Sequence, residues 1–246
     1  MGDIRVGIGG WVFAPWRGSF YPPGLTQARE LDYASRHVTS IEINGTFYGA
    51  QKPASFRRWR DETPDDFIFS VKGPRYATHR RVLAESGSSI ERFFDSGVLE
   101  LGAKLGPVLW QFPATTKYDA ENFGAFLDLL PRKREGRAIR HVLEARHDSF
   151  ADPGFSALMR RHEAAIALID AENQPSFDEK TADFAYARLK RAAEDVANGY
   201  KPKALADWAA RAREWAKSRD VFIYFINGAK VRAPSAAMAL IERLAH

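Results

Sequence analysis

Short apolar runs of four to six residues alternate along the chain with segments of helical period. This alternation is typical of βαβ units and predicts a parallel sheet. No internal repeat or linker-like segment interrupts it, so residues 1–246 are predicted to form a single domain, a (β/α)8 TIM barrel. The eight runs are Ile4–Gly9, Ser40–Ile43, Phe67–Lys72, Val108–Phe112, His141–Glu144, Ala165–Ile169, Phe184–Leu189 and Val221–Phe225.

Helices are predicted between most of these runs from their start and stop signals. One is expected over Leu25–His37, and Asp119 and Asp152 are candidate N-caps for two others. Ser88 and Glu91 form a candidate capping box for a helix whose apolar positions continue to Leu105, before Gly-Pro.

Two segments are predicted to lack a helix. Ala171–Asp183, between the sixth and seventh runs, contains Pro175 and has no periodic apolar face, so the sixth helix of the barrel should be missing. Arg132–Arg137 carries charge without aromatic residues and is interpreted as solvated surface.

Composition limits the chemistry and the partners. The chain has no cysteine, which excludes thiolate chemistry and leaves histidine and carboxylates as metal ligands. No apolar run approaches the length of a membrane span, and the N-terminus lacks a signal-peptide pattern, so a cytoplasmic protein without membrane contact is expected. The net charge of +5 favours anionic partners, although many proteins with this charge bind no nucleic acid.

Polar and aromatic residues concentrate where the predicted strands end, which is where TIM barrels build their sites. The aromatic residues among them could stack on bases or sugars, or close the barrel mouth as part of the core. The candidate substrate-binding residues are Trp11, Trp16, Tyr21, Asn44, Phe47, Tyr48, Lys72, Arg75, Gln111, Arg146, Asp170, Tyr186, Arg188 and Asn227.

Glu42 and Glu144 lie on the second and fifth runs, roughly across a barrel from each other. They could act as a general acid and base, or they could belong to a structural network with Arg146, Arg188 and Lys72. Glu42 lies within its strand and is expected to pair with Arg146 or Lys72. Glu144 ends its strand and is expected to face a solvent-filled pocket.

Two histidines, His79 and His147, follow predicted strands and are candidates for proton transfer. A divalent metal is an open alternative, with Glu42, Glu144, Asp170 and His147 as ligands, but the chain lacks a His-x-His or His-Glu-x-x-His motif. No other cofactor is indicated.

Several motifs, in order along nearly the whole chain, resemble the YecE-like family. They are Gly9-Gly10-Trp11, Glu42-Ile-Asn44, Thr46-Phe47-Tyr48, Gln111-Phe112-Pro113 and Glu144-Ala-Arg146-His147. The resemblance implies a TIM-barrel domain of unknown function. Its barrel is similar to those of xylose isomerase and metal-dependent apurinic-site endonucleases, which raises a nucleic-acid hypothesis by analogy of fold.

The chain departs from this family at two strands. Where many members have Tyr-x-Arg-Leu-His-Gly, this chain has Lys190-Arg191 in place of His-Gly. Where the family has Phe-Asn-Asn, this chain has Ile226 as the middle residue. If the family histidine has a role, that role is therefore dispensable in this chain, or Lys190 takes the place of the histidine with a permanent positive charge.

Three functions remain open. The first is a hydrolase or lyase acting on an anionic substrate, such as a phosphodiester, with Lys72, Arg75 and Arg146 holding phosphate. The second is a glycosidase-like enzyme that uses the two glutamates. The third is a non-catalytic binder of nucleic acid or protein. The expected partners are an anionic small molecule or single-stranded nucleic acid.

Overall fold

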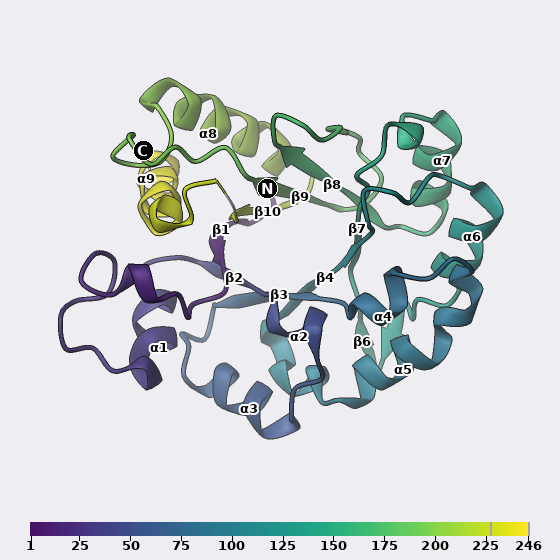
Figure 1. The fold of residues 1–246 in the computed structure, drawn as a ribbon, viewed down its shortest axis with the longest axis horizontal. Helices are drawn as coiled ribbons and strands as arrows, with labels where there is room; N and C mark the ends of the chain where they lie inside the picture. The colour runs from purple at the N-terminus through teal and green to yellow at the C-terminus, as the bar shows by residue number, and fades with distance from the viewer. Residues whose placement is uncertain (227, 246) are drawn as a thin grey trace.

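The eight predicted runs form one closed barrel of parallel strands in the computed structural model, which describes residues 1–226 and 228–245 (Figure 1). The strands follow one another around the barrel in chain order, and the last pairs with the first. This arrangement confirms the predicted TIM barrel. The strands are β1 (Ile4–Gly9), β2 (Ser40–Ile43), β3 (Ile68–Lys72), β4 (Leu105–Gln111), β7 (His141–Glu144), β8 (Ala165–Asp170), β9 (Phe184–Leu189) and β10 (Asp220–Phe225).

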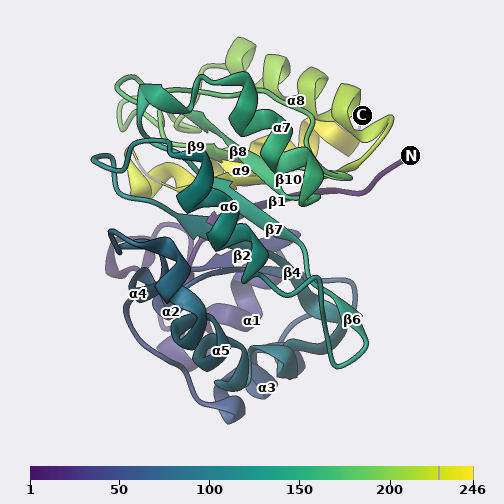
Figure 2. The same ribbon diagram turned by 90° about the vertical axis from the view of Figure 1, so that its right-hand side faces the viewer.

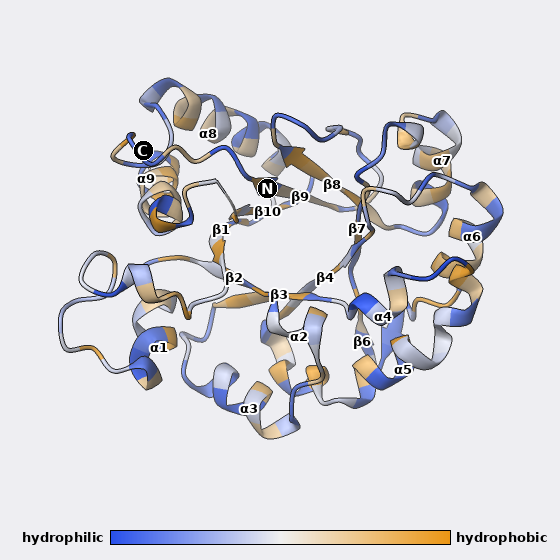
Figure 3. Ribbon diagram, viewed as in Figure 1, coloured by the Kyte–Doolittle hydropathy of each residue, from blue (hydrophilic) through white to orange (hydrophobic). Residues whose placement is uncertain are grey.

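Helices surround the barrel, as the view into it shows (Figure 1). The strands are mostly hydrophobic, whereas the helices combine hydrophobic and hydrophilic residues (Figure 3). The predicted gap is confirmed, since the described chain from 171 to 183, after β8, contains no helix. The helices are α1 (Glu30–Ser35), α2 (Gly45–Tyr48), α3 (Pro53–Asp61), α4 (Arg75–Thr78), α5 (Gly87–Asp95), α6 (Ala120–Asp128), α7 (Pro153–Arg161), α8 (Pro202–Ala216) and α9 (Ala233–Ala245).

The predicted N-caps of α6 and α7 are confirmed. The Asp119 side chain accepts a hydrogen bond from the backbone N–H of Asn122, and Asp152 accepts one from Gly154. Each side chain satisfies a backbone donor that has no partner within the helix.

Two helix predictions are wrong in extent. The segment expected as Leu25–His37 contains only one turn of 3-10 helix and the short α1. The capping box is also wrong, because Ser88 lies inside α5, which begins at Gly87. Gly97, in the left-handed region at φ 98°, ends that helical path, and Leu105 belongs to β4 rather than to the helix.

The exposed segment 132–138 contains an antiparallel hairpin that the sequence analysis missed. Its strands are β5 (Lys133–Arg134) and β6 (Arg137–Ala138). The turn residues Glu135 and Gly136 both have positive φ, as a two-residue hairpin turn requires. A Glu-Gly pair is a weaker turn signal than Asn-Gly, which explains the omission.

Alternate residues of the barrel strands point inward, because side chains of a strand have a period of two. In the middle of the barrel, the Ser40 and Tyr224 hydroxyls lie 2.7 Å apart, and those of Ser70 and Tyr186 lie 2.8 Å apart. Two residues further along three of these strands are Glu42, Lys72 and Arg188, so the next inward layer is charged.

The side view places both chain ends at one end of the barrel and the short helices α2 and α4 at the other (Figure 2). Because β1 begins near the N-terminus, the end with α2 and α4 is the one where strands finish. Among the described residues, no helix has both the length and the apolarity needed to cross a bilayer.

Candidate functional site

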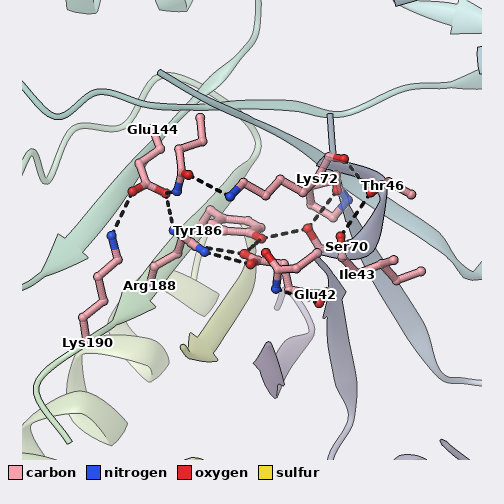
Figure 4. A network of polar contacts seen from close by, with 12 residues as sticks. Glu42, Ile43, Thr46, Ser70, Lys72, Glu144, Tyr186, Arg188 and Lys190 are labelled. Atoms are coloured by element: carbon pink, nitrogen blue, oxygen red, sulfur yellow. Dashed lines mark hydrogen bonds and ion pairs between the residues drawn. The ribbon is translucent and has the colours of Figure 1, made fainter. Parts of the chain in front are cut away.

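Arg188 lies between the two glutamates in the uppermost inward layer of the barrel (Figure 4). Its Nε and Nη2 donate to Glu42 at 3.0 and 2.9 Å, and its Nη1 donates to Glu144. All three side chains are buried. Arg146 or Lys72 was expected between the glutamates from the sequence; this expectation is wrong, because the intervening cation is Arg188.

Glu144 is surrounded by further donors. Its Oε1 accepts hydrogen bonds from Arg146 Nε at 2.7 Å and Lys190 Nζ at 2.9 Å, and its Oε2 accepts one from Gln111 Nε2 at 2.9 Å. The expectation of a solvent-filled pocket beside this residue is wrong, because the side chain is fully buried. Burial alone would raise the pKa of Glu144, but Arg188, Lys190 and Arg146 together hold it well below its usual range.

The Glu42 carboxylate also accepts a hydrogen bond from a tyrosine in the inward layer beneath it. The Tyr186 hydroxyl donates to Glu42 Oε2 at 2.7 Å, and the same hydroxyl lies 2.8 Å from Ser70 Oγ (Figure 4). Burial and the neighbouring Glu42 carboxylate raise the pKa of Tyr186 well above its usual value, so the phenol remains a donor. The carboxylate is thus fixed between a bidentate guanidinium and a phenol.

Lys72 belongs to the same layer but has different partners. Its Nζ donates to Gln111 Oε1 at 2.7 Å and lies 3.7 Å from the centre of the Phe47 ring. Because the Gln111 amide nitrogen is directed to Glu144, its carbonyl oxygen must face Lys72. Burial and Arg188 lower the pKa of Lys72 to about 8, although Glu42 and Glu144 oppose the shift.

A cavity of about 560 Å³ opens above this layer, at the end of the barrel where the strands finish. Four cationic side chains line it, and none of the described lining residues carries a carboxylate. The buried glutamates pair with two of these cations, Arg146 and Arg188, while all four cationic side chains line the cavity. The lining residues are Gly9, Gly10, Trp11, Val12, Ile43, Asn44, Gly45, Tyr48, Gln51, Trp59, Lys72, Gln111, Arg146, Arg188, Ile226 and Lys230.

Half of the predicted substrate-binding residues contribute to this lining, namely Trp11, Asn44, Tyr48, Lys72, Gln111, Arg146 and Arg188. Trp16 and Tyr21 are instead fully buried behind it. The Tyr21 hydroxyl donates to the backbone oxygen of Trp11 at 2.5 Å, and Trp16 Nε1 donates to that of Lys230 at 2.9 Å. Both hold lining residues in position.

The remaining predicted residues lie around or away from the cavity. Phe47 is buried under Lys72, with exposed His79 against its ring, and Arg75 is also exposed. His147 bonds within its own turn to Ser149, and Asp170 is contacted by Tyr200. Asn227 lies outside the described residues.

The four candidate metal ligands do not come together. Among the described residues, no three histidine or carboxylate side chains lie close enough to hold a metal ion. The oxygens of both glutamates accept hydrogen bonds from cationic or hydroxyl donors, while His147 and Asp170 have separate surroundings.

Several residues of the site were not predicted from the sequence, among them Lys230, Trp59 and Lys190. Lys230 follows the last strand by five positions, so extending each loop further would have found it. Trp59, on α3, has no local signal, because its position depends on how that helix packs. Lys190, noted only as a departure from the family, bonds Glu144 and also Gln174 Oε1 at 3.0 Å.

The whole arrangement of motifs can be compared with known families. The pattern of the family described as "Protein of unknown function DUF72" matches residues 5–246. This chain belongs to the DUF72 family. The resemblance to YecE-like proteins is thereby confirmed.

Relatives within DUF72 are moderately similar in sequence. The UPF0759 protein YecE of Escherichia coli (strain K12) is 30% identical over 152 residues, which cover 61% of this chain and 51% of that protein. The UPF0759 protein YunF of Bacillus subtilis (strain 168) is 29% identical over 174 residues, which cover 69% of this chain and 57% of that protein. The matches thus span little more than half of either relative's length.

The crystal structure of a DUF72 family protein from Thermotoga maritima MSB8 is similar to this chain with a TM-score of 0.80. The two chains are 22% identical, and the match covers 99% of this chain and 100% of the other. At this identity the similarity demonstrates the shared barrel fold.

Proposed function

We propose that the protein binds a small anionic substrate, bearing a phosphate or carboxylate group, in the cavity at the barrel mouth. The observation that carries the proposal is the lining: Lys72, Arg146, Arg188 and Lys230 face the cavity, and no carboxylate among the described residues does. Arginine suits oxyanions because its planar fork can donate two parallel hydrogen bonds.

The buried network also supports this proposal. Of five cationic groups at the site, only Arg146, Arg188 and Lys190 pair with the two carboxylates Glu42 and Glu144. The other two, Lys72 and Lys230, have no ion pair within the described part of the chain. An excess of positive charge at a partly desolvated site is costly until an anion enters. A bound anion would complete the charge balance of the layer.

Glu42 and Glu144 are proposed to position the cations rather than to transfer protons. A glycosidase-like mechanism needs one carboxyl group that stays protonated to donate its proton, which requires a raised pKa. The pKa of Glu144 is instead held well below its usual range, and its oxygens are occupied by four donors. The geometry therefore gives the glycosidase alternative less support than anion binding.

Fluorescence can test the proposal without knowledge of the natural ligand, because Trp11 and Trp59 line the cavity with their rings 5.1 Å apart. Titration with inorganic phosphate and with pyruvate is expected to change the tryptophan emission, whereas glycerol should not. The apparent affinity should weaken with added salt. Emission that responds equally to glycerol, or to no anion, would contradict the proposal.

A pair of arginine variants provides the control. Arg146 lines the cavity and pairs with Glu144, whereas Arg160 pairs with Glu179 at 2.7 Å on the surface of α7. Arg146→Gln is expected to weaken anion binding about tenfold to a hundredfold, the loss of one charge-assisted hydrogen bond. Arg160→Gln should leave it unchanged.

Single-stranded nucleic acid is a second candidate, because aromatic and basic side chains are exposed together at the same end. Tyr48 and Tyr76 are 66% and 57% exposed, and the Arg75 guanidinium lies 5.3 Å from the Tyr76 ring centre. Exposed rings beside arginine suit stacked bases. Oligonucleotide affinity should then fall steeply with salt. Affinity without salt dependence, or none at low salt, would remove this candidate.

A further inference from the structure

Lys72 differs from the other buried cations of the site in having no carboxylate within ion-pair distance in the described chain. Arg188 holds both glutamates, and Lys190 holds Glu144. Within residues 1–226 and 228–245, the one hydrogen-bond acceptor of Lys72 Nζ is the neutral amide oxygen of Gln111. Loss of its proton would therefore break no ion pair and could keep that hydrogen bond, since an uncharged amine still donates.

The position of this amine is fixed. Lys72 ends strand β3, its backbone oxygen accepts a hydrogen bond from Thr46 Oγ1 at 2.6 Å, and the Phe47 ring covers one side of Nζ. Gln111 holds Nζ from another side and is itself held by Glu144. Lys72 also lines the cavity, although only 6% of the residue is exposed, so the amine is immobilised beside the space that a ligand would fill.

We propose that Lys72 forms an imine with the carbonyl group of a small anionic aldehyde or ketone bound in this cavity. The inference rests on the proposed function, because Arg146, Arg188 and Lys230 would hold the anionic group while Nζ meets the carbonyl carbon. Lysines that form Schiff bases are activated by desolvation or by a neighbouring cation, and Lys72 has both.

The reaction needs no oxidant or reductant. The lone pair of the uncharged amine attacks the carbonyl carbon, a C–N bond forms, and the carbonyl oxygen takes up one proton as the nitrogen gives one up, which yields a carbinolamine. The C–O bond then breaks: the oxygen leaves as water with a second proton, the nitrogen loses its remaining proton, and the C=N bond forms. Protonation of the imine restores a positive charge beside Phe47, where the ring face stabilises it.

Ionisation makes this step accessible near neutral pH. Arg188 and Arg146 repel the charged form of Lys72, and Glu42 and Glu144 attract it, while burial lowers its pKa to about 8. At about pH 7.5, about a quarter of Lys72 is then uncharged, against about one in a thousand for an exposed lysine. The dependence of trapping on pH should follow this uncharged fraction.

Reductive trapping tests the inference. The protein, residues 1–246, would be incubated with glyoxylate, or separately with pyridoxal 5′-phosphate, reduced with borohydride, digested, and examined by mass spectrometry at each lysine. Lys72 is expected to carry at least tenfold more adduct than exposed Lys203. Adducts spread over the surface lysines without enrichment at Lys72 for either probe would overturn the inference.

Lys190 is the internal control. Burial lowers its pKa to about 8 as well, but Lys190 does not line the cavity and already bonds Glu144 and Gln174. Little adduct is expected there. Equal labelling of Lys72 and Lys190 would show that the lowered pKa alone determines the reactivity. It would overturn the inference that the cavity directs imine formation to Lys72.

Two further comparisons separate this inference from the proposed function. Glyoxylate should be trapped at Lys72 faster than uncharged glycolaldehyde, and inorganic phosphate should slow trapping of pyridoxal 5′-phosphate. Anion binding without a Lys72 adduct would overturn the imine and leave the proposed function standing. A Lys72 adduct that forms equally fast with the uncharged aldehyde, in a protein that binds no anion, would overturn the proposed function. Lys72→Arg should lose the adduct, because a guanidinium group does not form an imine.

Discussion

Arg188 donates two hydrogen bonds to Glu42, from Nε at 3.0 Å and from Nη2 at 2.9 Å, although the two residues lie 146 positions apart in the sequence. Its third nitrogen reaches Glu144, so one guanidinium joins strands β2, β7 and β9 inside the barrel. Because two buried carboxylates would otherwise repel each other, this residue is central both to stability and to the charge of the cavity.

Arg188→Met should strongly destabilise the protein. The substitution leaves two buried carboxylates without their shared cation, and breaking a buried ion pair costs about 3 to 5 kcal/mol. Urea unfolding at neutral pH measures this loss. As the control, Arg58→Met removes an exposed arginine 3.6 Å from Glu62, and its cost should stay below about 1 kcal/mol. Equal effects of the two substitutions would contradict the central role of Arg188.

Glu144→Gln should lower stability, and the loss should depend on pH. The variant removes the carboxylate that pairs with Arg146 and Lys190, and leaves Arg188 paired with Glu42 alone. Because the folded pKa of Glu144 is depressed, its contribution is present above the unfolded pKa of about 4.3 and disappears as pH falls below it. The difference in unfolding free energy between parent and variant should therefore shrink on acidification. An unchanged melting temperature at neutral pH would return Glu144 to the candidates for proton transfer.

The sequence predicts the charged layer well but not its connections. Glu42, Lys72, Gln111, Glu144 and Arg188 all lie at or near strand ends, and the fold of a TIM barrel brings those positions together. Which cation joins the glutamates depends on the registers of strands far apart in sequence, and no local pattern carries that information. For the same reason Trp59, which reaches the cavity from helix α3, had no signal. The break at Gly97 was missed because the apolar positions after it continue a helical spacing.

His141, at the start of β7, should make stability sensitive to mild acid. Its Nδ1 accepts a hydrogen bond from Trp110 Nε1 at 3.1 Å, so its Nε2 must carry the proton that is donated to Pro131 O at 2.9 Å. Burial lowers the pKa of His141 to about 4. Below about pH 6.5 the unfolded chain binds a proton that the folded protein excludes, so stability should fall by about 3 kcal/mol between about pH 6.5 and pH 4.

Urea titrations of the parent and of His141→Gln across that pH range measure this contribution. Each protein gives a slope of unfolding free energy against pH. The difference between the two slopes is the contribution of His141, because the carboxylates that titrate in the same pH range contribute to both. Parallel slopes would show that His141 gains its proton in the folded protein as readily as in the unfolded chain.

Gly7 and Gly9 lie on the same face of β1, yet substitution by alanine should affect them differently. A Cβ at Gly7 would lie 1.9 Å from the backbone oxygen of Ser40, which belongs to the neighbouring strand and cannot move away without opening the barrel. A Cβ at Gly9 would meet only the end of the Ile226 side chain at 3.0 Å, with Asn44 Nδ2 at 3.2 Å. Gly7→Ala should therefore lower the free energy of unfolding by at least about 1 to 3 kcal/mol, the range typical of overpacking, because the two strands would have to separate. Gly9→Ala should lower it less.

Because Gly9 also lines the cavity, Gly9→Ala should weaken the fluorescence response to phosphate while the protein stays folded. Thermal unfolding and the phosphate titration, measured on both variants, test this separation, and a more stable Gly7→Ala than Gly9→Ala would contradict it.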